Sequence, residues 1–175
     1  RTTLLRSGGK QQLVGFESEE KVSNALLRVI RDDVKVVYFV TGHGENRLAS
    51  KQRTGYLAAK TAIEKENYEV RELLLASAAG VPEDATVVVV AGPKKDLLAE
   101  ELEKLAAYVE RGGSLLFLVD PSPTVELSGF LESYGFKLGN DIIVDKRGQM
   151  VGANYLSPVV MEYSKKHAIV KDFNV

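Results

Sequence analysis

Residues 86–91 have the sequence TVVVVA, an unbroken apolar run without a charged side chain. A strand with one face in water alternates apolar and polar residues, whereas a strand covered on both faces does not. Residues 35–40 and 114–119 are nearly continuous in apolar residues as well, after Lys35 and Ser114. These three runs therefore predict a mostly parallel sheet that is covered by helices on both faces.

Segments with helical spacing of apolar residues separate these runs. Residues 97–109 predict a helix, closed by glycines 112–113, whose polar side would face solvent. Helices are also predicted over about 49–67 and 125–134, and around residues 22–30, where Ser18 is a suitable N-cap. The residues expected on the solvent side of the 97–109 helix are Glu100, Glu101, Glu103 and Lys104.

Two weaker strand signals complete the pattern. Residues 68–75 carry several charges, which is typical of a strand near a sheet edge, and Ile142-Ile143-Val144 predicts a further strand. Strands that alternate with helices predict a three-layer, doubly wound α/β fold. We expect one domain over residues 1–175, with an N-terminal arm (1–16), a core (17–144) and an irregular C-terminal part (145–175).

Composition excludes several classes of protein. Lysine and arginine total 23 against 24 acidic residues, and the net charge of -1 argues against a nucleic-acid partner. The chain has no cysteine, so disulfides, thiolate metal sites and a cysteine nucleophile are excluded. No run has the apolar length of a membrane span, and the chain begins at Arg1. We interpret it as a domain excised from a larger protein.

The candidate site follows from a rule about parallel sheets, in which ligands bind beyond the carboxyl ends of the strands. The segments after the three strongest strands are 41–46, 92–94 and 120–122, and they would converge if those strands are neighbours. The first of them places two glycines around a titratable histidine, beside a carboxylate. The candidate binding residues are Gly42, His43, Gly44, Glu45, Gly92, Pro93, Asp120 and Pro121.

Four interpretations of this site remain open. A phosphate or flavin site lacks support, because neither a complete glycine fingerprint nor a P-loop is present. A metal site would need His43 and His167 together with carboxylates such as Glu45 or Asp120. A hydrolase would have to use His43 or Glu45 as a base, since there is no serine nucleophile elbow. The fourth interpretation is a turn with no ligand.

Ordered segments along the chain resemble a known family. Residues 38–45, YFVTGHGE, are similar to a YFLTGHGE segment of the GldG-like family of ABC-transporter auxiliary proteins, which is associated with bacterial gliding motility. Residues 167–173 resemble a later HPIT segment of that family, with Ala168 in place of proline and Val170 in place of threonine. The other matching segments are NALLR (24–28), VPEDA (81–85), AGP (91–93), YVERGG (108–113) and LVDP (118–121).

This resemblance implies a flavodoxin-like or class I glutamine-amidotransferase-like domain without a catalytic triad. It implies no enzyme activity and no cofactor. The expected partners are an ABC permease and ATPase, together with a small polar ligand such as a sugar, or a peptide. Similar domains in intraflagellar-transport proteins point to a binding or scaffolding role. The implied location is the periplasmic face of the bacterial inner membrane, with transmembrane anchors outside these residues.

Overall fold

A computed structural model describes residues 2–15, 18–30, 34–121, 125–144, 160 and 162–171. The chain divides into two compact units, Arg1–Leu138 and Gly139–Val175. All helices and strands of the described residues belong to the first unit. None of the helices in this described part combines the length and the apolar character needed to cross a membrane.

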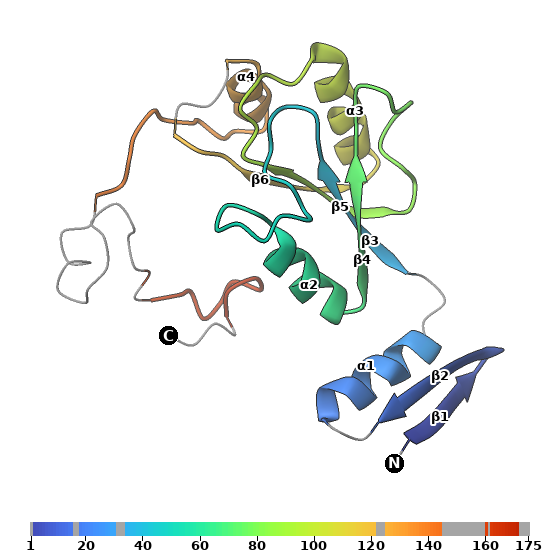
Figure 1. The fold of residues 1–175 in the computed structure, drawn as a ribbon. Helices are drawn as coiled ribbons and strands as arrows, with labels where there is room; N and C mark the ends of the chain where they lie inside the picture. Colours follow the sequence, from blue (N-terminus) through green and yellow to red (C-terminus); the bar gives the residue numbers. More distant parts are fainter. Residues whose placement is uncertain are drawn as a thin grey trace. The chain divides into compact units, whose positions relative to one another are not determined.

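The centre of the first unit is a four-stranded parallel sheet (Figure 1). Its order is β4-β3-β5-β6, and each neighbouring pair is parallel. From β3 the chain goes to one side for β4 and to the other side for β5, so the strand order reverses between β3 and β5. The strand bounds are β3 (Lys35–Val40), β4 (Tyr68–Leu73), β5 (Ala85–Ala91) and β6 (Ser114–Leu118).

Helices flank both faces of this sheet (Figure 1), which confirms the predicted doubly wound, three-layer α/β class. The central strand β5 divides its side chains between two cores because successive residues point to opposite faces. Val88 and Val90 pack with α3 (Ala99–Glu110) and Phe130 of α4 (Val125–Ser133). Val89 and Ala91 belong to the other core, against which Ile63 of α2 (Leu57–Lys65) packs.

The edge strands differ from each other. Charged β4 lies at one edge, as predicted. Strand β6 forms the other edge of the described sheet, and the prediction that both of its faces are covered is wrong. Leu116 and Leu118 are 47% and 42% exposed, while Leu115 and Phe117 on the opposite face pack against the α3 core. An apolar run shows that a strand is suited to burial, but not that a helix is present to bury it.

Two other predicted elements differ in the structure. Helix α2 begins at Leu57 and not near residue 49, because hydrogen-bonded turns occupy the start of the segment, where Ser50 and Tyr56 both donate to the Arg47 carbonyl. Ile142–Val144 forms no strand, and its three side chains are 53–72% exposed. β-branched residues favour a strand, but a strand also needs a hydrogen-bonded neighbour.

The N-terminal residues, where no period is visible, form an antiparallel hairpin of β1 (Thr2–Ser7) and β2 (Lys10–Gly15). Its two-residue turn, Gly8-Gly9, has positive φ at both positions, which a hairpin turn of this length favours. Helix α1 (Glu19–Ile30) packs against this hairpin. Its capping is as predicted, since the Lys21 backbone N–H donates to the Ser18 hydroxyl at 3.3 Å.

Candidate functional site

The loops after β3, β5 and β6 lie side by side at the carboxyl edge of the sheet. The backbone N–H groups of Lys94 and Lys95 donate to the His43 carbonyl at 2.8 and 3.0 Å, which joins the first loop to the second. The Gly92 N–H donates to the backbone carbonyl of Leu118 at 2.7 Å, and this bond joins the second loop to the end of β6. We call residues 41–46, 92–94 and 120–121 the loop cluster. It lies where the strand order reverses, the usual ligand position in such sheets.

His43 is buried within this cluster, with only 7% of its surface exposed. Its ring lies between two carboxylates. Nε2 is 2.8 Å from Glu101 Oε2, and Nδ1 is 3.3 Å from Glu45 Oε1. The second oxygen of Glu45 accepts the backbone N–H of His43 at 2.8 Å, so Glu45 holds both the ring and the main chain of the histidine.

Glu101 is the residue of this site that sequence reasoning missed. The helical period assigns it to the solvent side of α3, but it is only 1% exposed. It lies three residues after the N-cap Leu98, which has no side-chain acceptor, and its Oε2 accepts the Leu98 N–H at 2.8 Å. A glutamate three residues after the N-cap is one half of the capping-box signal, and the sequence lacks the other half because Leu98 stands where that signal has Ser or Thr.

The proton count of this cluster is constrained by its geometry. Both ring nitrogens of His43 face carboxylate oxygens. A neutral imidazole carries one N–H, and an ionised carboxylate only accepts. Two hydrogen bonds therefore require one more proton, either on the ring or on a carboxyl group. With both nitrogens engaged inside the protein, His43 is poorly placed to act as a base toward a bound substrate.

Gly44 shows why the first loop needs glycine. Its φ is +86°, a conformation that residues with a side chain rarely adopt. A Cβ atom there would lie 3.2 Å from Cβ of Lys94, so the aliphatic part of that lysine packs directly over the glycine. The sharp turn thus lets the second loop approach the first.

The predicted site residues differ in how far they are exposed. His43 and Gly92 are buried and the Glu45 side chain is 4% exposed, so these residues build the cluster from inside. Pro93 is half-buried. The residues that face solvent are Gly42, Gly44, Asp120 and Pro121. Asp120 lies close to the second loop, since a Cβ on Gly92 would be 3.6 Å from its Oδ2.

The described part of the structure does not support a metal site. Within the described ranges, no group of three or more histidine, aspartate or glutamate side chains is arranged to hold a metal ion. The buried His43, Glu45 and Glu101 are instead bonded to one another and to backbone N–H groups.

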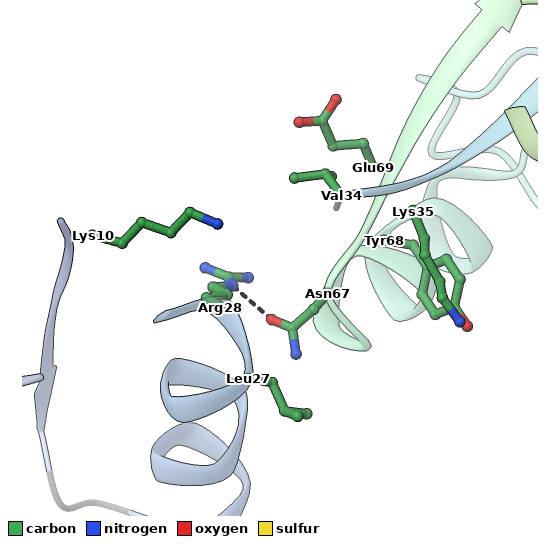
Figure 2. Close-up of a pocket in the computed structure, with 8 residues that line it drawn as sticks. All are labelled: Lys10, Leu27, Arg28, Val34, Lys35, Asn67, Tyr68 and Glu69. Atoms are coloured by element: carbon green, nitrogen blue, oxygen red, sulfur yellow. Dashed lines mark hydrogen bonds between the residues drawn. The ribbon is translucent and has the colours of Figure 1, made fainter. Parts of the chain in front are cut away.

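A cavity of about 390 Å³ lies elsewhere, beside the first residues of β3 and β4 (Figure 2). Arg28 of α1 and Asn67, which precedes β4, meet there through a 2.6 Å hydrogen bond from Nε to Oδ1. Asn67 also donates to Asn24 of α1 at 2.9 Å. None of the predicted site residues lines this cavity, whose lining is Lys10, Leu27, Arg28, Val34, Lys35, Asn67, Tyr68 and Glu69.

Comparison with known proteins assigns the chain to a family. Residues 34–171 match the model of the ABC-transporter auxiliary family, described as an ABC-type uncharacterized transport system. The chain belongs to this family. The match includes the whole parallel sheet and the loop cluster of this ABC-transporter auxiliary chain, and it agrees with the resemblance to GldG-like proteins. No curated protein and no solved structure gives a significant match.

Proposed function

We propose that this chain is a non-catalytic, extracytoplasmic auxiliary domain of an ABC-type transport system, and that its loop cluster is a binding surface. Family membership supports the link to transport. One observation carries the choice of surface: hydrogen bonds join the three loops at the carboxyl edge of the sheet, where Gly42 and Gly44 of the first loop and Asp120 of the third are exposed. Exposed glycine backbone and a carboxylate suit hydroxyl or amide donors, so the proposed ligand is a sugar or a peptide.

The environment of His43 supports binding over catalysis. A general base must reach the proton that it abstracts, within hydrogen-bond distance of the substrate. Here the only histidine of the loop cluster is buried, and both of its ring nitrogens face carboxylates of the same protein. Glu45 and Glu101 are equally enclosed. We therefore assign these residues to the construction of the site and not to a reaction.

The proposed partners are the permease and the ATPase of the same system. A peptide ligand would then be an extracytoplasmic segment of the permease. The proposed anchoring, by transmembrane helices outside these residues, and the role in gliding motility are supported by the resemblance to GldG-like proteins. The location of the domain is tested independently of the ligand.

Binding is tested by NMR of the ¹⁵N-labelled chain, titrated with a panel of sugars and with peptides from extracytoplasmic loops of the permease. We expect one class to shift the amide signals of Gly42, Gly44 and Asp120. Removing a hydrogen bond to a charged group costs roughly 1.5–3 kcal/mol, so Asp120→Asn should weaken binding by about tenfold or more. The exposed carboxylate of α4 gives the matched control, Glu132→Gln, which should bind normally. Shifts confined to residues outside the loop cluster, or none with either class, would reject the proposal.

The location is tested with a cysteine introduced at the exposed Lys51 of the full-length protein. Residues 1–175 contain no cysteine, so Lys51→Cys is the only labelling site within them. If the domain is extracytoplasmic, a membrane-impermeant maleimide labels Lys51→Cys in cells whose outer membrane alone has been opened. The unsubstituted full-length protein is the control. Labelling that requires lysis of the inner membrane would place the domain in the cytoplasm and contradict this part of the proposal.

A further inference from the structure

We infer that a second surface of this chain, a groove along helix α2, binds an acidic peptide segment in an extended conformation. The groove is a cavity of about 600 Å³ between residues 50–55 and one face of α2, and we call it the α2 groove. No residue of the loop cluster lines it. The inference therefore goes beyond the proposed function and does not rest on it.

The α2 groove is positively charged, although the whole chain has a net charge of -1. Its described lining includes no carboxylate and three exposed cationic side chains, Lys51, Arg53 and Lys65. Glu64 precedes Lys65 in the sequence, but its carboxylate pairs with Lys60 at 3.8 Å. Like charges around one hollow repel one another, and an anionic partner in the hollow relieves this repulsion. The charge of the groove therefore favours an acidic partner.

The groove is elongated, because its helical wall runs along the whole of α2. The residues of this wall recur on one face of the helix, from Leu57 through Ala58, Thr61 and Ala62 to Lys65. A rise of about 1.5 Å per residue makes the wall about 12 Å long. An extended peptide advances roughly 3.3 Å per residue, so about four residues cover the same distance. A compact anion such as free phosphate would occupy only a small part of it.

The cationic residues of the groove come from both ends of α2. Lys51 and Arg53 belong to the loop before the helix, and this loop is held at the start of the helix because the Tyr56 N–H donates to the Arg47 carbonyl at 3.2 Å. Lys65 is the last residue of the helix. We therefore expect a peptide with two acidic residues about four positions apart, one for each end of the groove.

The loop wall of the groove has a fixed shape. The Gly55 N–H donates to the Gln52 carbonyl at 2.8 Å, and a Cβ at Gly55 would lie 2.2 Å from the Ser50 carbonyl oxygen. A residue with a side chain therefore cannot replace Gly55 unless the loop moves. Gln52 also lines the groove, where its amide can donate to and accept from the backbone of a peptide. A wall that is already formed loses little freedom when a ligand binds, which favours affinity.

The test is an NMR titration of the ¹⁵N-labelled chain with a short peptide of serines that carries two glutamates about four residues apart. The control peptide has glutamines in their place, which keep the shape and remove the charge. We expect the acidic peptide alone to give saturable shifts of the amide signals of Gln52, Gly55 and Thr61. The signals of the loop cluster stay unchanged, which distinguishes this result from the test of the proposed function.

Substitutions in the groove test the role of its charge. Lys51→Gln combined with Arg53→Gln should weaken binding of the acidic peptide by roughly tenfold, because each exposed ion pair contributes about two- to fivefold in affinity. The matched control is Arg6→Gln combined with Lys137→Gln, which also removes one arginine and one lysine. Both of these residues are exposed and neither lines the groove, so binding should be unchanged.

Three results would overturn the inference. The first is equal shifts with the two peptides, or none with either, because the groove would then not recognise acidic residues. The second is an equal loss of binding in the two double variants, which would show an effect of net charge alone. The third is displacement of the acidic peptide by inorganic phosphate at the same concentration, which would indicate a site for small anions. The comparison of the two peptides uses the unsubstituted chain, so it decides the question even if a variant fails to fold.

Discussion

Replacing His43 with alanine lowers the free energy of unfolding by at least about 1–3 kcal/mol, the usual cost of leaving a buried polar group without its hydrogen-bond partner. The alanine leaves the carboxylates of Glu45 and Glu101, whose side chains are 4% and 1% exposed, without the ring that bonds them. Urea unfolding followed by circular dichroism at neutral pH measures the loss as a lower midpoint with an unchanged slope.

The control is His167→Ala, in which an exposed histidine is removed and the change stays within about 0.5 kcal/mol. A double-mutant cycle with Glu101→Ala separates the pair from its surroundings. We expect the double variant to be less destabilised than the sum of the two single variants, because each single change strands the other partner. Strictly additive losses, or a loss below about 1 kcal/mol for His43→Ala, would contradict the bonding described here.

The second large effect is expected in the core between the sheet and α3. Leu105→Ala should lower the free energy of unfolding by about 2–5 kcal/mol, because it leaves a cavity that the surrounding structure fills only in part. Leu105 is fully buried and belongs to the same cluster as Val88 and Val90 of β5. The same urea experiment measures it.

Leu98→Ala provides the comparison, since this leucine adjoins α3 but is 60% exposed. Its cap is made through its backbone N–H, which alanine retains. We expect a change within about 0.5 kcal/mol. Equal effects at the two leucines would show that α3 does not pack on the sheet as described.

The sheet could be predicted because its evidence is local. Uninterrupted apolar runs indicate β3 and β5, and charged residues indicate that β4 lies near an edge. What could not be predicted depends on neighbours that are far apart in sequence. Leu116 and Leu118 of β6 are 47% and 42% exposed, which their apolar run does not indicate. Ile142–Val144 has the composition of a strand, but composition does not supply a hydrogen-bonded partner.

The sequence predicts where the candidate site lies in the fold, but not which side chains bond to one another inside it. The rule for parallel sheets identifies the three loops, and the strand order brings them together. The burial of His43 depends on a contact with Glu101, which lies 58 residues further along the chain. The helical period assigns Glu101 to solvent, and only the structure identifies Leu98 as the N-cap whose N–H group Glu101 accepts. The structure shows that capping prevails.

The strand order also has a consequence for the nascent chain. One edge of β3 pairs with β4, but the other pairs with β5, which is synthesised only after α2 and β4. While Ala85–Ala91 is still inside the ribosome, β3 has an unpaired apolar edge in water. Open strand edges of this kind favour aggregation before folding is complete. The valine run that fills the centre of the folded sheet covers this edge of β3, and its own far edge stays unpaired until β6 is synthesised.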